Sequence, residues 1–219
     1  AVFVLCIACG SLLVSALPRI PRGLLIGSQL LLVALLSAAY GQIPQLPLLA
    51  HELRTAFSLA EVAFPLFYAS AFALALACMA PALLLSGAGL PLVFDHLRRR
   101  YGELGATAGR LYSWNTLGSL LGALVGGYAL LFWLDLHHVY RIAVSALALA
   151  AASLAIAQAR ESRRAAPAIA ALLVLAPALA LLLRAPGWSQ ELLSAGLFRI
   201  RTPLPGARAG ADAGTALRN

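Results

Sequence analysis

The adjacent histidines His137 and His138 have the clearest capacity for metal chemistry in this sequence. They lie between Asp135 and Arg141 at the end of a long apolar run, where imidazole could hold a metal ion or the central metal of a haem or chlorophyll-type pigment. A polar turn at a membrane surface explains the same residues without a ligand. We favour the polar turn and therefore expect no metal and no cofactor. If a metal is bound here, His137 and His138 are its candidate ligands.

A second signal is the pair Cys6 and Cys9, which has the C-x-x-C spacing of redox and metal-binding motifs. The pair stands inside an apolar run without a histidine, an acid or a second cysteine pair nearby. We therefore interpret both cysteines as small packing residues of a membrane helix.

The densest positive charge is the run Arg98, Arg99 and Arg100, which follows Phe94 and precedes Tyr101. Such a run could bind anionic lipid headgroups or an acidic partner surface, and each arginine near a membrane contributes about 1 kcal/mol. Positive charge beside a membrane helix also sets the orientation of a membrane protein. This role alone would explain the run.

The composition around these residues excludes an ordinary soluble protein. Of the 219 residues, 62% are hydrophobic and 11% are charged, and the mean hydropathy is +0.88. All 16 basic residues are arginine, and the net charge of +8 is typical of short basic connections between apolar helices rather than of a nucleic-acid surface. We therefore expect a membrane protein whose partners are lipids and other membrane subunits or a second copy, with no nucleic acid.

Long apolar runs define the predicted helices, because lipid tolerates no unpaired backbone and a span needs about 20 residues. Six runs qualify, over residues 1–17, 23–40, 62–85, 111–134, 139–158 and 165–183. The sequence therefore predicts an all-α fold, a polytopic transmembrane bundle of about six spanning helices over residues 1–183. Residues 184–219 are expected to form an extramembrane tail that is partly disordered.

The connections between these helices carry their own signals. Residues 41–61 predict an interfacial segment, ending in a capping box from Ser58 to Glu61. Glycine and proline over residues 86–91 predict a break, followed by a basic amphipathic segment over 92–103. A tight turn is expected over 135–138.

Arginine counts predict the orientation, because cytoplasmic connections carry the excess of positive charge. Connections one, three and five hold Arg19, Arg22, Arg98, Arg99, Arg100, Arg110, Arg160, Arg163 and Arg164, against Arg54, Arg141, Arg184, Arg199 and Arg201 on the other side. The first connection is therefore expected to be cytoplasmic.

The helix over 111–134 carries the most informative face. Gly118, Gly122 and Gly126 recur every four residues, with Gly127 adjacent, so another helix could approach the backbone closely. Asn115 near the start of this helix needs a partner across an interface or in a polar cavity. We call Gly118, Gly122, Gly126 and Gly127 the glycine face and predict that it packs against another helix.

Two motifs in this part of the chain resemble a known family. The first is GRLYSWNTLGSLLGALVGGY over residues 109–128, preceded by Leu90 and Pro91, and the second is GWSQELLSAGLFRI over residues 187–200. Together they resemble the membrane part of bacterial spermidine synthase-like proteins, in which the second motif joins the membrane section to a soluble domain. The resemblance covers about residues 87–200.

The resemblance implies an aminopropyltransferase domain after the joint, with a glycine-rich nucleotide loop and acidic residues that hold an amine and decarboxylated S-adenosylmethionine. Neither feature occurs in this sequence: Gly206, Gly210 and Gly214 follow no strand pattern, and Asp212 is the nearest acid. No catalytic residue can therefore be transferred to this chain.

The leading interpretation is a noncatalytic membrane scaffold or accessory subunit of the bacterial inner (cytoplasmic) membrane, packing through the glycine face. Two alternatives stay open. One is the membrane anchor of an aminopropyltransferase whose catalytic domain is missing here. The other is a transporter-like module. The predicted spans 62–85, 111–134 and 165–183 carry no charge, which argues against ion-coupled transport but not against passage of an apolar molecule.

Overall fold

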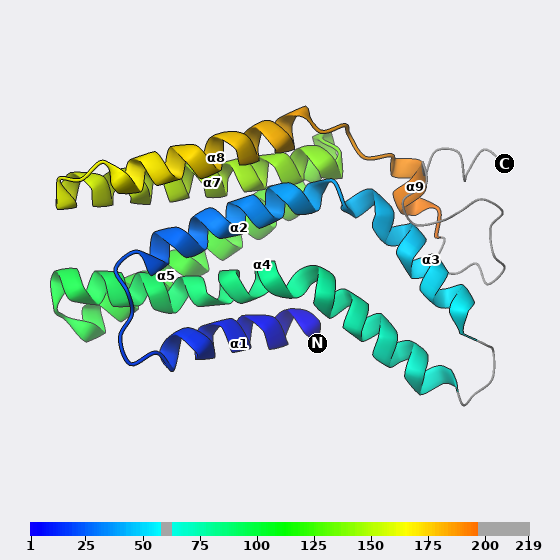
Figure 1. Cartoon of the computed structure of the whole chain (residues 1–219), viewed down its shortest axis with the longest axis horizontal. Coiled ribbons are helices and arrows are strands. Elements are labelled where there is room, and N and C mark those ends of the chain that lie inside the picture. The colour runs from blue at the N-terminus through cyan, green and yellow to red at the C-terminus, as the bar shows by residue number, and fades with distance from the viewer. Residues whose placement is uncertain (58–62, 197–219) are drawn as a thin grey trace.

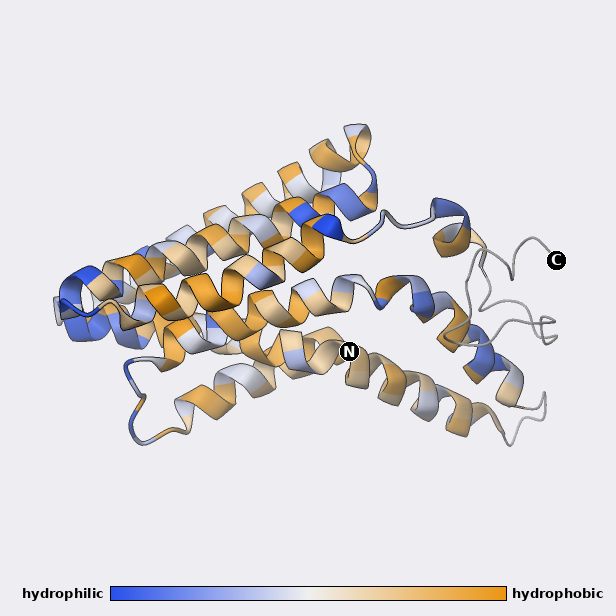
Figure 2. Cartoon of the chain, turned by 45° about the horizontal axis from the view of Figure 1, so that its top comes forward, coloured by the Kyte–Doolittle hydropathy of each residue, from blue (hydrophilic) through white to orange (hydrophobic). Residues whose placement is uncertain are grey.

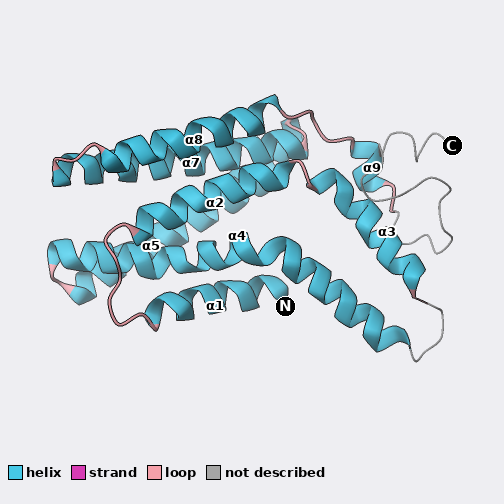
Figure 3. Cartoon of the chain, in the orientation of Figure 1, coloured by secondary structure: helices cyan, strands magenta, loops and turns pink. Residues whose placement is uncertain are grey.

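The computed structural model describes residues 1–57 and 63–196. Within these ranges every regular element is helical: α1 (Val2–Ser15), α2 (Leu24–Tyr40), the short 3₁₀ helix η1 (Ile43–Gln45), α3 (Leu46–Ala56), α4 (Phe64–Tyr101), α5 (Leu104–Leu121), the π-helical segment η3 (Gly122–Ala129), α6 (Leu130–Trp133), α7 (Leu136–Ser162), α8 (Ala166–Arg184) and α9 (Gln190–Ser194). The loops within these ranges are short (Figure 3), and α5, η3 and α6 follow one another without a loop. The predicted all-α fold class is confirmed for this part of the chain, and the expected capping box at Ser58 and Glu61 lies outside it.

Among the described residues, four helices are long and apolar enough to cross a membrane: α4, the combined helix Leu104–Trp133, α7 and α8. We call Leu104–Trp133, which comprises α5, η3 and α6, the α5–α6 span. The pair Leu24–Tyr40 and Ile43–Ala56, bent by 47°, makes a fifth span if it is counted as one. These helices indicate a membrane protein, with fewer spans than the six that the sequence predicted.

The number of candidate spans is smaller than the predicted six because of the first apolar runs. Helix α1 has 14 residues, which at 1.5 Å per residue is about 21 Å, against a hydrocarbon core of about 30 Å. The predicted interfacial segment over 41–61 is itself largely helical as η1 and α3. In Figure 1, α3 and the first part of α4 extend away from α2, α7 and α8.

Helix α4 corrects a boundary predicted from the sequence. It has 38 residues and continues through Pro81 and Pro91, so the break expected over 86–91 and the separate segment over 92–103 are wrong. Apolar helices tolerate glycine and proline where a neighbouring helix packs against them, and α1 lies against this part of α4 (Figure 1). The ribbon of α4 bends but does not end, and the helix stops only at Gly102, whose φ of 76° caps it.

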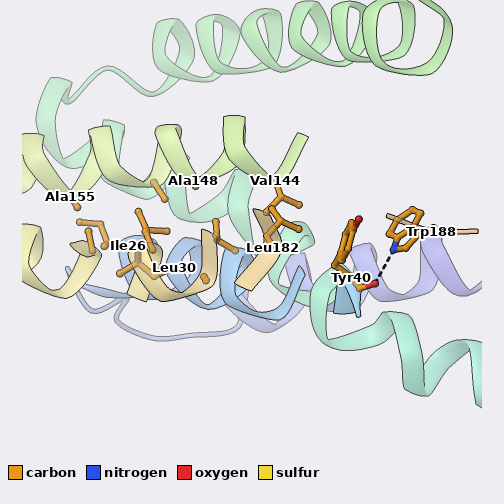
Figure 4. Packing of buried hydrophobic residues seen from close by; sticks show 13 residues of the cluster. Ile26, Leu30, Tyr40, Val144, Ala148, Ala155, Leu182 and Trp188 are labelled. Atoms are coloured by element: carbon orange, nitrogen blue, oxygen red, sulfur yellow. Dashed lines mark hydrogen bonds between the residues drawn. The ribbon is translucent and has the colours of Figure 1, made fainter. Parts of the chain in front are cut away.

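The main core lies between α2, α7 and α8 (Figure 4). Its buried residues are Ile26, Leu30, Val33 and Tyr40 from α2, Val144, Ala148, Ala151 and Ala155 from α7, and Ala171, Leu175, Ala178 and Leu182 from α8, together with Trp188. On α7 the small residues recur at spacings of three and four, so the neighbouring helices can approach its backbone closely. On α7, alanine rather than glycine therefore makes most of the contact surface of this core.

A second packed region lies where α1 crosses α4. A Cβ built at Gly10 would lie 2.9 Å from the carbonyl carbon of Leu84, and one at Gly87 would lie 2.7 Å from the Cα of Ile7. Both helices therefore touch backbone to backbone at these glycines. Sequence reasoning missed both positions, although Cys6, which it interpreted as a packing residue, is buried on the same face of α1.

The polar ends of the helices lie at two ends of the molecule. Arg99 donates a 2.8 Å hydrogen bond to the carbonyl of Ile20, and Arg100 forms an ion pair with Glu161. Three arginine-rich connections therefore meet at one end, where hydrophilic residues gather at the left of Figure 2. The α6–α7 link and α9 lie at the opposite end (Figure 1).

Candidate functional site

The structure leaves the glycine face open. Gly118 lies in α5, and Gly122, Gly126 and Gly127 lie in η3. A Cβ added at any of the four would meet no other atom within 4 Å among the described residues. No helix of the described chain therefore packs there, and the predicted contact stays a prediction about another molecule.

The backbone of the α5–α6 span also changes form within this face. The eight residues of η3 are π-helical, with i→i+5 hydrogen bonds in place of the i→i+4 pattern. Such segments are rare and usually shorter, and they occur frequently at functional sites. The glycine face thus combines exposed backbone with an irregular helix.

Asn115 lies on α5, one turn before Gly118, and is exposed. The hydroxyl of Ser119 donates a 2.8 Å hydrogen bond to its backbone carbonyl. Within the described ranges its side-chain amide has no hydrogen bond that the structure shows. In a helix that crosses a membrane, an exposed amide is costly unless a partner supplies hydrogen bonds.

The arginine run predicted as a lipid or partner surface forms an ion-pair network instead of standing free. Asp95, buried one turn earlier on α4 with 8% of its surface exposed, accepts from Arg98 at 3.1 Å and from Arg99 at 2.8 Å. Arg100 reaches across to Glu161 of α7. The i,i+3 and i,i+4 spacing of Asp95 was a signal in the sequence for the first two pairs.

Three aromatic rings join helix ends at the opposite end of the molecule. Trp188, 7% exposed, lies with its ring centroid 4.7 Å from that of Tyr40 and 5.4 Å from that of Tyr140. Its indole N–H donates to the carbonyl of Tyr40 at 3.1 Å (Figure 4), and the Tyr40 hydroxyl donates to the carbonyl of Pro186 at 3.0 Å. The segment after α8 is therefore fixed to the ends of α2 and α7.

Arg141 of α7 strengthens the same joint. Its guanidinium carbon lies 5.1 Å from the centroid of the Tyr40 ring, and its Nη2 donates to the carbonyl of Ala185. A cation over an aromatic face contributes more where water is excluded. The beginning of the predicted tail, through α9, is thus attached to the bundle.

The two candidate metal ligands lie in the first turn of α7, because that helix begins at Leu136 and not at the predicted residue 139. His137 and His138 lie with Asp135, and one ligand atom from each falls within 4.8 Å of the others. The carboxylate of Asp135 accepts a hydrogen bond from Gln190, and a Cβ at Gly187 would lie 3.1 Å from Nε2 of His137. These contacts place the group between the start of α7 and the segment after α8.

Comparison with known protein families, curated proteins and solved structures finds no match. The likeness to spermidine synthase-like membrane sections therefore rests on the two sequence motifs alone.

Proposed function

We propose that the chain is a noncatalytic membrane scaffold or accessory subunit of the bacterial cytoplasmic membrane, which binds another transmembrane helix at the glycine face. One observation carries this proposal. The α5–α6 span is apolar enough to cross a membrane, yet none of its most apolar 18-residue window is buried. Its glycines expose backbone to a volume that the described chain leaves empty.

The physics of helix association in lipid supports this assignment. Lipid tails are as apolar as leucine, so helices associate through close packing and interhelical hydrogen bonds. Glycine in a helix interior costs about 0.5–1 kcal/mol relative to alanine, so the four glycines together cost roughly 2–4 kcal/mol. Packing of a partner helix against the exposed backbone offsets this cost, and contact with lipid does not.

Asn115 gives the contact a polar component. Its amide can donate to and accept from a side chain or a carbonyl of a partner helix. Interhelical hydrogen bonds of this kind contribute about 0.6–2 kcal/mol in membranes. The amide and the glycine backbone together suit a single helix lying along the α5–α6 span.

Substitution of Gly122 by leucine tests the proposal. The leucine side chain enters space that is empty within the chain, so Gly122→Leu should fold normally but exclude the partner helix. Blue-native electrophoresis in mild detergent should show the loss of the larger assembly, while thermal unfolding stays near that of the wild type. Expression of the chain alone distinguishes a second copy, which assembles without other proteins, from a different subunit, which does not.

Gly109→Leu is the matched control, because Gly109 also lies in α5 with nothing within 4 Å of an added Cβ. Gly109 precedes Gly118 by nine residues, which is half a turn out of phase at 3.6 residues per turn. The control should keep the assembly. Equal assembly of wild type and Gly122→Leu would remove the glycine face from the argument.

A second candidate function is the membrane anchor of an aminopropyltransferase, and the docked joint favours it. Trp188 and Arg141 hold the segment after α8 against the bundle, which would set the position of a following domain. The arginine-rich end lies opposite to α9, however. If that end is cytoplasmic, α9 faces away from the compartment in which the nucleotide donor implied by the resemblance is made.

Assay of the purified chain and sequencing of its gene separate these candidates. Without a phosphate-binding loop or paired acids, the 219 residues should produce no spermidine from decarboxylated S-adenosylmethionine and putrescine. Turnover that survives repurification would contradict the scaffold proposal. A gene that continues past the codon of Asn219 into a nucleotide-binding domain would favour the anchor.

A further inference from the structure

A cavity of about 370 Å³ lies at the arginine-rich end, outside the glycine face. Its walls come from the α1–α2 connection and the start of α2, the last turns of α4 and the last turns of α7. The lining residues are Ile20, Pro21, Arg22, Leu25, Leu92, Asp95, His96, Arg99, Arg100, Gln158, Glu161 and Ser162. The cavity therefore lies where three predicted cytoplasmic connections meet.

The walls of this cavity are chemically divided. Ile20, Pro21, Leu25 and Leu92 are apolar, and Leu25 and Leu92 are buried in the core beneath the cavity. The remaining walls carry arginine, histidine, amide, hydroxyl and carboxylate groups. A ligand with a polar head and an apolar continuation matches such walls better than a small ion does.

The charges that line the cavity leave it positive. Three arginines, Arg22, Arg99 and Arg100, stand against two carboxylates, Asp95 and Glu161, which leaves one positive charge. Asp95 also binds Arg98 outside the cavity wall, so its negative charge is shared between two guanidinium groups. The uncompensated charge favours an anion.

Hydrogen-bond donors stay available for that anion. Arg99 donates to Asp95 and to the carbonyl of Ile20, and Arg100 donates to Glu161, whereas a guanidinium carries five N–H donors. Arg22 is exposed and makes no hydrogen bond or ion pair that the structure shows within residues 1–57 and 63–196. Guanidinium groups match the oxygens of a phosphate in paired hydrogen bonds.

We propose that this cavity binds the phosphate of an anionic phospholipid headgroup. Arg22, Arg99 and Arg100 surround the phosphate, and the apolar wall contacts the lipid acyl chains where they join the glycerol. The position at the end of apolar helices places the cavity at headgroup depth, where basic pockets between membrane helices hold anionic lipids. The inference requires that the chain lie in a membrane but does not depend on the glycine face. Failure of one proposal therefore leaves the other standing.

Native mass spectrometry of the detergent-purified chain tests the site. Phosphatidylglycerol and phosphatidylcholine with identical acyl chains are the probes, and inorganic phosphate is the soluble comparison. We expect phosphatidylglycerol to be retained preferentially and to raise the unfolding temperature, and inorganic phosphate at equal concentration to do neither. Equal retention of both lipids, or equal stabilisation by inorganic phosphate, would overturn the assignment to an anionic lipid.

The variant Arg22→Gln, with Arg19→Gln as its control, locates the binding. Both arginines are exposed and belong to the same connection, so each substitution removes one charge, but Arg19 does not line the cavity. Arg22→Gln should weaken retention of phosphatidylglycerol at least about tenfold, the effect of losing one charge-assisted contact to the phosphate, while Arg19→Gln should weaken it less. Equal losses in the two variants would mean that surface charge, and not the cavity, attracts the lipid.

Discussion

The α1–α4 crossing and the α5–α6 span both place glycine inside apolar helices, but their surroundings differ. At the crossing, Gly10 and Gly87 face the backbones of Leu84 and Ile7, and a Cβ would collide with each. On the span, Gly118, Gly122 and Gly126 have nothing within 4 Å of an added Cβ among the described residues.

This difference separates two uses of glycine. At the crossing, glycine is required by the fold of the single chain, because no side chain fits between α1 and α4. On the span, the described part of the chain does not require glycine, and the regular spacing of four residues fits the partner contact that we propose. Regular spacing alone therefore does not reveal which glycines pack within the chain.

Gly10→Ala should produce the largest effect. The added methyl carbon would lie 2.9 Å from the carbonyl carbon and 3.0 Å from the Cα of Leu84, so the backbones must move apart. Overpacking of this kind costs about 1–3 kcal/mol. Unfolding in sodium dodecyl sulfate, followed by circular dichroism, should show this loss of stability.

Gly27→Ala is the matched control for that substitution. Gly27 lies in α2 with nothing within 4 Å of an added Cβ, so alanine should leave the free energy of unfolding unchanged or raise it by up to about 1 kcal/mol. Stability of Gly10→Ala equal to that of Gly27→Ala would show that α1 and α4 do not touch as described.

The sequence predicted the class of fold but not its internal contacts. Apolar runs of about 20 residues indicate membrane helices, because lipid leaves the backbone few alternatives. Alanine facing lipid and alanine facing a helix look alike in such runs, so the core positions Ala148, Ala151 and Ala155 could not be distinguished from their neighbours. The break expected over 86–91 was wrong for a related reason, since packing of α1 at Gly87 stabilises a helix that local propensity would end.

The candidate sites were predicted in part. Arg98, Arg99 and Arg100 were identified as a charged surface, and the pairing with Asp95 was within reach of helical spacing. The ion pair with Glu161, 61 residues away, and the cavity beside it depend on how α4 and α7 meet, which local patterns do not specify. Trp188 was noted only as part of a motif, and its burial between Tyr40 and Tyr140 follows from the folding back of the chain after α8.

Gly118→Ala should have a smaller effect, and of the opposite sign to Gly10→Ala. An added methyl group meets no atom of the described chain, and alanine is the better helix former, so the monomer should gain about 0.5–1 kcal/mol. The same detergent titration of the monomeric protein measures it. A loss as large as that of Gly10→Ala would mean that a neighbour within the chain already covers the glycine face.

A partner helix in the membrane can reach the glycine face only if the α5–α6 span crosses the membrane. Cysteine labelling at the two ends of the molecule can test this crossing. Cysteine at Glu103, just before α5, and cysteine at Glu191, in α9, mark opposite ends of the molecule (Figure 1). Gly102 is unsuitable for labelling, because its φ of 76° would strain any other residue. Alanine should replace the three native cysteines in the background of both variants.

A membrane-impermeant maleimide applied to intact spheroplasts should label Glu191→Cys at once and Glu103→Cys only after lysis, because the arginine-rich end is predicted to be cytoplasmic. The reverse pattern would invert the orientation but keep the crossing, so the glycine face would still lie at membrane depth. Labelling of both positions before lysis would place the two ends on one side. The exposed glycines would then face water or a re-entrant path, and a lipid-embedded partner helix would no longer explain their spacing.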